Sequence, residues 1–201
     1  MNTQQEFWDK AWTLLRRGTV DKRHGFNTGT LSTLYHGGAV AGAAIPKSRT
    51  VVLREVDARL GTMTCFTDRR SRKVAQLRGV PYASWCFWDL RSKLQITGYG
   101  TVTMDTGEAA RRRLLALPKH SRRAYATLSA PGSSLGAAQS GLPADWDSLE
   151  LEQTDYAADN FTILTTTLLE MDILELGRSH RRLNAARPTG SDDWALNWVV
   201  P

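Results

Sequence analysis

Several features that would narrow the choice of function are missing from the sequence. It contains no run of about 18 apolar residues, so no membrane-spanning helix is predicted. The first residues, MNTQQEFWDKAW, carry acidic side chains and no apolar stretch, and do not resemble a signal peptide. We therefore expect a cytoplasmic protein.

Cysteine is scarce, and the two that occur, Cys65 and Cys86, each lie inside a hydrophobic run. Without a C-x-x-C pair or a Cys/His cluster, the sequence predicts buried free thiols and no metal site. Neither paired carboxylates nor a Ser/His/Asp arrangement stands out. The catalytic residues, if there are any, stay unknown at this point.

The composition is that of an ordinary globular protein. The 201 residues are 41% hydrophobic and 23% charged, and without internal repeats they predict a single domain over 1–201. Lysine and arginine number 26 against 20 acidic residues, a net charge of +6. Such an excess favours an anionic partner, either nucleic acid or a phosphorylated small molecule. The seven tryptophans would supply aromatic surface to both, so charge alone does not decide.

Hydrophobic periodicity predicts a mainly β chain with short helices. Within the N-terminal segment 1–20, apolar residues recur at three- and four-residue spacing and predict a helix over 3–17. Alternating or β-branched stretches predict strands at 30–37, 49–56, 61–67, 81–88, 93–104 and 161–176, followed by a terminal strand. Further helices are expected at 71–79, 107–117 and 119–129, and a loop over 130–148. This pattern favours an α+β, mainly β fold, a small antiparallel barrel with peripheral helices.

Positive charge gathers at the ends of two predicted strands. RTVVLR covers 49–54, and FTDRRSRK covers 66–73. Ser71, Arg72 and Lys73 open a helix, where cationic side chains, free backbone N–H groups and the helix dipole together suit a phosphate. Arg49 and Arg54 are five residues apart, so an ideal strand points them to opposite faces. At least one of them must reach such a site from a bent end, or serve another purpose.

The order and spacing of these motifs resembles the pyridoxamine 5′-phosphate oxidase-like family of FMN-binding split barrels. RTVVLR is followed by a hairpin, by FT three residues ahead of SRK, by a strand closing on Gly98, and by SAPGSS in place of the family's serine loop. The likeness runs over about 25–201. It implies an antiparallel FMN-binding split β-barrel and a homodimer with FMN at the subunit interface.

The resemblance also implies which residues bind the cofactor. Ser133 would come from the partner subunit, and either Lys93 or Gln95 would take the position of a family glutamine. The full set that it implies is Arg49, Thr50, Val51, Val52, Leu53, Arg54, Phe66, Thr67, Ser71, Arg72, Lys73, Lys93, Gln95 and Ser133.

The substrate-binding positions of the family are not kept. Its Tyr, Arg and Ser set falls on Arg113, Leu117 and Ser121, and its RLHDR motif reads RLNAA from Arg182. Ser121 and Arg182 are the only remaining substrate-binding candidates, so oxidation of vitamin B6 phosphates is not expected. The FMN-binding positions persist where the substrate positions do not.

We therefore expect an FMN-dependent oxidoreductase that transfers a hydride at flavin N5 on an unidentified substrate. A cation at Lys93 or Arg54 would stabilise the reduced, anionic flavin. One alternative is a flavin-binding or sensor protein without turnover. The other, less favoured, is a nucleic-acid binder that uses 111–113 and 122–125.

Overall fold

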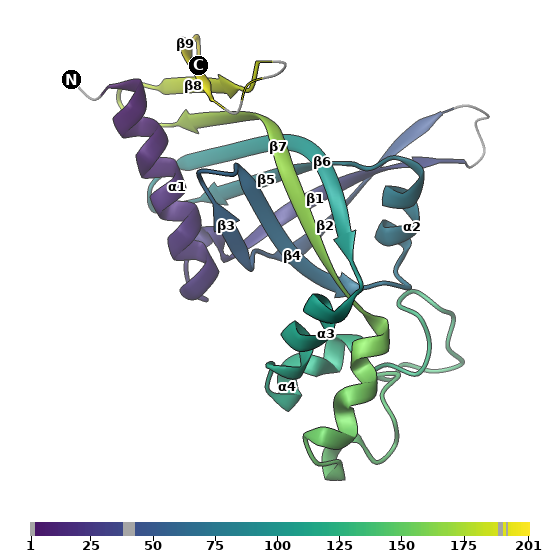
Figure 1. Ribbon diagram of the computed structural model, residues 1–201. Helices are drawn as coiled ribbons and strands as arrows, with labels where there is room; N and C mark the ends of the chain where they lie inside the picture. Colours follow the sequence, from purple (N-terminus) through teal and green to yellow (C-terminus); the bar gives the residue numbers. More distant parts are fainter. Residues whose placement is uncertain (1–2, 38–42, 189–190, 192) are drawn as a thin grey trace.

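A computed structural model describes residues 3–37, 43–188, 191 and 193–201, and in this part of the chain nine antiparallel strands form one strongly curled sheet (Figure 1). The strands are β1 (Thr28–His36), β2 (Ala44–Val52), β3 (Glu55–Asp57), β4 (Thr62–Asp68), β5 (Tyr82–Asp89), β6 (Leu94–Asp105), β7 (Phe161–Glu175), β8 (Arg181–Ala186) and β9 (Ala195–Val199). Their order is β2-β1-β5-β6-β7-β4-β3, with β8 on β7 and β9 on β8. The mainly β antiparallel architecture predicted from the sequence is confirmed.

The chain itself closes the barrel. β2 and β3 end the main strand order on opposite sides, yet only Leu53 and Arg54 separate them in sequence. The N–H of Leu53 donates to the carbonyl of Asn27 at 2.9 Å, and that of Arg54 to the carbonyl of Thr64 at 2.8 Å. The two sheet edges therefore meet at this junction.

The long strand β7 produces the split in the barrel. It pairs with β6 over most of its length, with β4 through its first half and with β8 through its last residues. Opposite it, β6 shifts register between Tyr99 and Gly100. A Cβ at Gly100 would lie 1.9 Å from the carbonyl oxygen of Thr167, so only glycine fits where the two strands cross this irregularity.

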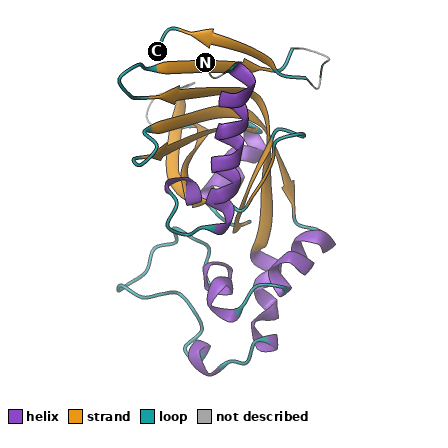
Figure 2. Cartoon of the chain, turned by 90° about the vertical axis from the view of Figure 1, so that its left-hand side faces the viewer, coloured by secondary structure: helices purple, strands orange, loops and turns teal. Residues whose placement is uncertain are grey.

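Helix α1 (Gln4–Val20) lies along one side of the barrel (Figure 2). It begins with a capping box, in which Thr3 and Glu6 bond each other's backbone N–H groups. Its apolar stripe is buried against the barrel core through Phe7, Trp8, Ala11, Trp12 and Leu15. The predicted N-terminal helix is therefore present and runs to residue 20, with residues 1–2 outside the described part.

A second, smaller core lies below the barrel and is built from short helices (Figure 2). They are α3 (Glu108–Leu115), α4 (Lys119–Arg122) and the 3-10 helices η2 (Arg123–Tyr125), η3 (Trp146–Ser148) and η4 (Glu152–Asn160). Arg122, buried at their centre, donates to the carbonyls of Leu115, Leu117 and Leu151 and to the carboxylate of Asp155. This one guanidinium fixes three segments whose helices are too short to be stable alone.

The structure differs from the sequence prediction in several places, among them β8 (Arg181–Ala186), which was not predicted as a separate strand. The strand predicted at 49–56 is two strands, β2 and β3, and β2 already begins at residue 44. The helix predicted at 119–129 ends at residue 125, and η4 was not predicted. Helix α2 (Arg72–Gly79) agrees with the prediction, as does the loop at 130–145, which lies in front of η3. Throughout the described ranges, every helix is too short or too polar to cross a bilayer.

Candidate functional site

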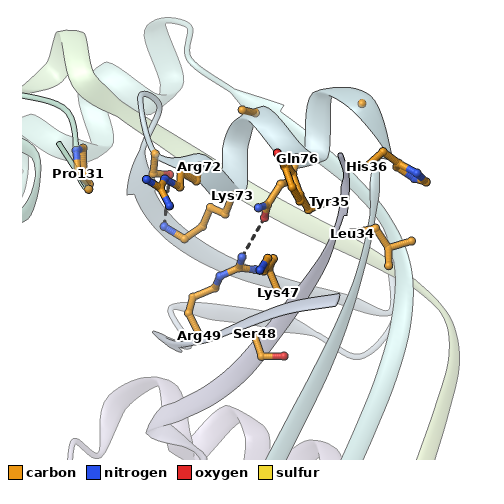
Figure 3. Close-up of a pocket in the computed structure, with 14 residues that line it drawn as sticks. Leu34, Tyr35, His36, Lys47, Ser48, Arg49, Arg72, Lys73, Gln76 and Pro131 are labelled. Atoms are coloured by element: carbon orange, nitrogen blue, oxygen red, sulfur yellow. Dashed lines mark hydrogen bonds between the residues drawn. The ribbon is translucent and has the colours of Figure 1, made fainter. Parts of the chain in front are cut away.

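A groove of about 970 Å³ lies between α2 and the hairpin formed by β1 and β2 (Figure 3). We call it the α2–hairpin groove. One wall comes from the hairpin, with Tyr35, Lys47 and Arg49, and the other from α2, with Gln76. Residues 131–132 of the long loop close the end at which α2 begins.

The first turn of α2 supplies donors to this end of the groove. The N–H groups of Val74 and Ala75 both donate to the carbonyl of Ser71. The amides of Arg72 and Lys73 precede them and belong to the first turn, which has no intrahelical acceptors. Ser71 is at the N-cap as predicted, although its hydroxyl accepts from Lys73 instead of capping the helix. This end of the groove thus combines backbone N–H groups, the positive end of the helix dipole and two cations.

Lys73 is half-buried and points across the groove entrance. Its Nζ donates to the Thr67 hydroxyl at 2.8 Å and to the Ser71 hydroxyl at 3.3 Å. Burial lowers the pKa of Lys73, and the nearby charge of Arg49 lowers it further. The charged ammonium is therefore held in a place where an incoming anion would stabilise it.

Arg49 belongs to the floor of the groove. Its Nη1 donates to the Leu31 carbonyl at 3.1 Å and to the Thr33 hydroxyl at 2.7 Å, and its Nη2 to Gln76 Oε1 at 2.9 Å. These three bonds use three of the five N–H donors of a guanidinium, which leaves two for a ligand. Burial also lowers the pKa of Arg49. With Arg72 exposed beside it, this donor set fits a phosphate dianion, which takes several charge-assisted bonds from fixed directions.

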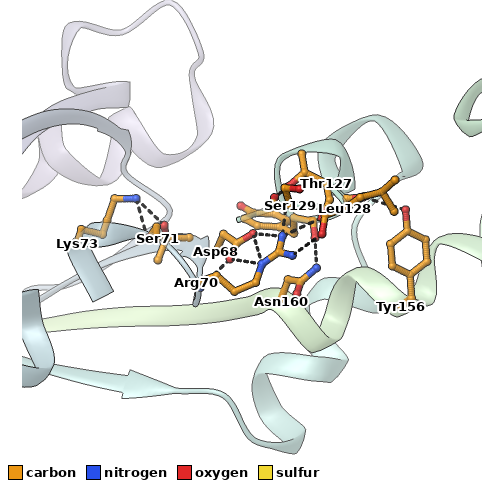
Figure 4. A network of polar contacts seen from close by, with 12 residues as sticks. Asp68, Arg70, Ser71, Lys73, Thr127, Leu128, Ser129, Tyr156 and Asn160 are labelled. Atoms are coloured by element: carbon orange, nitrogen blue, oxygen red, sulfur yellow. Dashed lines mark hydrogen bonds and ion pairs between the residues drawn. The ribbon is translucent and has the colours of Figure 1, made fainter. Parts of the chain in front are cut away.

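The loop that closes the groove is held by Arg70 (Figure 4). Its guanidinium pairs with the buried Asp68 at 2.7 Å and donates to the carbonyls of Thr127 at 2.9 Å and Leu128 at 3.3 Å. The loop then reaches the groove, where a Cβ at Gly132 would lie 3.7 Å from Arg72 Nε. The sequence prediction missed this role, since Arg70 is one of several neighbouring cations and its acceptors in the loop are more than fifty residues away.

The residues assigned by resemblance to the flavin ring lie beside the groove without lining it. Leu53 is fully buried in the barrel core, and Val51 packs against that core, whereas Thr50 and Val52 lie on the other face of β2. The strand ends at Val52, so Arg54 lies outside β2 and the alternation of that strand does not determine where its side chain points. Leu53 therefore acts as a core residue in this chain.

Phe66 and Thr67 point to opposite faces of β4. Thr67 faces Lys73 through its hydroxyl. Phe66 packs in the helical core against Phe161, with the guanidinium carbons of Arg54 and Arg113 each 5.5 Å from its ring centroid. Arg54 therefore covers an aromatic ring and does not line the groove.

Two predicted residues lie at the far end of the sheet. Lys93 is exposed in the turn between β5 and β6, with φ of 50°, and Gln95 lies two residues further along β6. The groove is near the Tyr82 end of β5, and this turn follows its Asp89 end. An eight-residue strand spans roughly 24 Å, so one chain cannot bring Lys93 to the groove.

The remaining predicted residues are also apart from the groove. Arg182 lies on β8, two strands away from Gln95 on the same face, and pairs with Asp172 at 2.9 Å. Ser121 belongs to α4 in the helical core region. Ser133 follows the groove-lining residues 131–132 and is exposed.

The basic stretch 111–113 is ion-paired. Arg111 lies 3.6 Å from Asp159 and Arg112 lies 3.5 Å from Glu108, and Arg113 pairs with Glu55. These carboxylates reduce the charge that would attract a nucleic acid. Within the described ranges, no cluster of His, Cys, Asp and Glu is arranged to hold a metal ion.

Comparison with known proteins places the chain in a family. Residues 8–105 match the family described as pyridoxamine 5′-phosphate oxidase, FMN-binding domain, and the chain belongs to this pyridoxamine 5′-phosphate oxidase-like family. No curated protein matches the chain.

Solved structures show the same fold over almost the whole chain. A pyridoxamine 5′-phosphate oxidase-related, FMN-binding protein from Nostoc punctiforme is 20% identical with a TM-score of 0.77, over 96% of this chain and 97% of its own. PhzG from Burkholderia lata, solved with tetrahydrophenazine-1-carboxylic acid, is 15% identical with a TM-score of 0.65, over 98% and 90%. A general stress protein 26-related protein from Clostridium acetobutylicum is 12% identical with a TM-score of 0.54, over 90% and 95%. The split-barrel fold expected from the sequence is confirmed.

Proposed function

We propose that this chain binds FMN, with the phosphate at the start of α2. The observation that carries the proposal is that Arg72 and Lys73, at the α2 end of the groove, and Arg49, on its floor, line the same groove. Two of these cations have lowered pKa values, and an anion between them would relieve both the burial and their mutual repulsion. The family to which the chain belongs is an FMN-binding one, which agrees with this donor set.

We further propose that the protein is an oxidoreductase acting on an unidentified substrate. Bound FMN would supply hydride transfer through its N5 atom. The chain's part is to bind and orient: the α2 donors fix the phosphate, and Arg70 holds the loop that covers this end of the groove. We do not extend the proposal to vitamin B6 phosphates, since Leu117 packs into the helical core and Arg182 is paired with Asp172.

A homodimer would complete such a site. Lys93, Gln95 and Arg182 lie on a surface that one chain keeps away from the groove, so a site using both sets needs two chains. The same outer face of β5 and β6 exposes three aromatic side chains: Tyr82 at 46%, Trp88 at 42% and Tyr99 at 46%. Exposed aromatic residues gathered on one sheet face are typical of an interaction surface. Trp88→Glu should shift a dimer to monomers in analytical ultracentrifugation, and an unchanged mass would argue against this face.

The cofactor is tested by titrating the purified protein with FMN and following flavin absorbance and fluorescence. Removing two cations that bind phosphate removes charge-assisted bonds of about 1.5–3 kcal/mol each, so Arg72→Ala/Lys73→Ala should weaken FMN binding by roughly 10²- to 10⁴-fold. Arg69→Ala is the matched control, because Arg69 is exposed next to the same turn and outside the groove. Riboflavin, which lacks the phosphate, should bind weakly to all variants.

Two outcomes would contradict the proposal. One is an absence of FMN binding by the wild-type protein. The other is a double variant that binds FMN as tightly as the Arg69→Ala control.

A further inference from the structure

The α2–hairpin groove continues past the proposed phosphate position, away from the flavin ring. On β2, Val51 follows Arg49 toward the ring-side residues, whereas Lys47 precedes it on the same face. Two residues of strand place Lys47 about 7 Å from Arg49 along the hairpin. Figure 3 shows Arg72 and Lys73 on one side and the Arg49–Gln76 hydrogen bond next to them, with Lys47 beside Arg49 and Tyr35 beside Gln76. Leu34 and His36 lie on the far side.

The volume of the groove covers both the phosphate end and this far part, and it excludes the residues assigned to the ring. None of 50–54, Phe66 or Thr67, the residues assigned to the ring side, lines the groove of about 970 Å³. Such a volume is at the upper end of the range for small-molecule sites. FMN, whose phosphate is terminal and would bind at α2, would therefore leave most of the groove volume unfilled.

The chemistry of the far part suits a second phosphate and a flat base. Lys47 is exposed, and no side-chain hydrogen bond or ion pair among the described residues involves its ammonium group. Tyr35 lines the groove and leaves 40% of its surface exposed, which provides an aromatic side chain for stacking. Opposite, a Cβ at Gly79 would meet no atom within 4 Å, which leaves open space at the end of α2. Aromatic side chains bind bases by stacking without needing a particular hydrogen-bond pattern.

We propose that the groove accepts a flavin whose phosphate is not terminal, namely flavin adenine dinucleotide (FAD). Its first phosphate binds at α2 as proposed for FMN, Lys47 donates to the second phosphate, and the adenine stacks on Tyr35. This inference rests on the proposed function, because it uses the same phosphate position. It adds two residues, Lys47 and Tyr35, which the FMN proposal does not use.

The test compares the dissociation constants of FMN and FAD, measured by quenching of flavin fluorescence, for the wild-type protein and three variants. Lys47→Ala and Tyr35→Ala should each weaken FAD binding by about 5- to 100-fold, the range expected for losing one charge-assisted contact or one stacked base. FMN binding should change less than about 2-fold, since neither side chain reaches a terminal phosphate. Arg78→Ala is the control, because Arg78 is exposed on α2 and does not line the groove.

Because each variant is judged by the ratio of FAD to FMN affinity, a general loss of folding does not imitate the expected result. FAD binding more than about tenfold weaker than FMN in the wild-type protein would overturn the inference, and so would equal effects of the variants on both flavins. In either case FMN binding that depends on Arg72 and Lys73 would leave the proposed function standing. Failure of FMN itself to bind would instead reject the proposed function.

Discussion

Removing the Arg70 side chain should destabilise the protein more than removing any other cation of the stretch 69–73. In Arg70→Ala the buried carboxylate of Asp68 loses its ion pair, and the carbonyls of Thr127 and Leu128 lose their donor. Asp68 keeps only the bond from the Arg70 backbone N–H, at 2.7 Å. The buried Asp68 carboxylate is thus left with a single hydrogen bond and no ion pair.

The expected size follows from these contacts. Hydrogen bonds to charged groups contribute about 1.5–3 kcal/mol each, and breaking a buried pair from one side costs about 3–5 kcal/mol. The Arg70 side chain is 25% exposed, and the retained backbone bond lessens the loss. We therefore expect the free energy of unfolding to fall by about 2–4 kcal/mol.

Urea denaturation followed by tryptophan fluorescence measures this change, with Arg69→Ala as the control. Arg69 is exposed, so its removal should change stability by less than about 0.5 kcal/mol. In the double variant Asp68→Asn/Arg70→Ala the loss should be smaller than the sum of the single losses, because the unpaired charge is gone. If Arg70→Ala and Arg69→Ala were equally stable, the role of Arg70 in holding the loop would be refuted.

Three further predictions concern other parts of the chain. Burial and a neighbouring cation lower the pKa of Lys73 below its ordinary 10.5, so the stability of the protein without cofactor should rise with pH through the window between the two values. FMN binding should weaken over the same pH window, because the Lys73 ammonium loses its charge. Calorimetry measures the binding and denaturation the stability, and Lys73→Arg, which stays charged, should show neither trend. Burial raises the pKa of Cys65 to about 12, so a thiol reagent should leave Cys65 unmodified in the native protein and modify it after unfolding; a reactive Cys65 in the native protein would contradict the buried position. Gly100→Ala should lower the unfolding free energy by at least about 1–3 kcal/mol, whereas Gly136→Ala, with nothing within 4 Å, should be neutral in the same denaturation assay.

The sequence predicted most elements of the fold because their patterns are local. The alternation of β5 and the capped amphipathic α1 are visible in short windows, and the structure has both. The break between β2 and β3 was missed since it depends on barrel closure, a contact between the two ends of the main strand order. Helix η4 was missed because it is held in place by hydrogen bonds from Arg122, which is far away in sequence.

The site divides in the same way. Ser71, Arg72 and Lys73 form one local motif, and the structure places them together at the groove. Phe66 and Thr67 are adjacent in sequence, yet strand geometry points Phe66 into the helical core and Thr67 toward Lys73 at the groove. Lys93 could take part in the flavin site only if a second chain brought it there, so its role in binding stays a prediction. Lys47 and Tyr35 carried no sequence signal, because a groove between a hairpin and a helix exists only after folding.

The two strands β4 and β7 serve both hydrophobic cores at once. Cys65 and Leu164 are paired across these strands and face the barrel core, whereas the next pair, Phe66 and Ile163, faces the helical core. Detaching the helices would therefore uncover the apolar outer surface of both strands. Opening of the helical part should then be nearly as costly as global unfolding, so amide hydrogens of η4 should exchange about as slowly as those of β7. The loop that closes the groove is attached to the helical core. Its position should therefore stay fixed as long as the two cores unfold together.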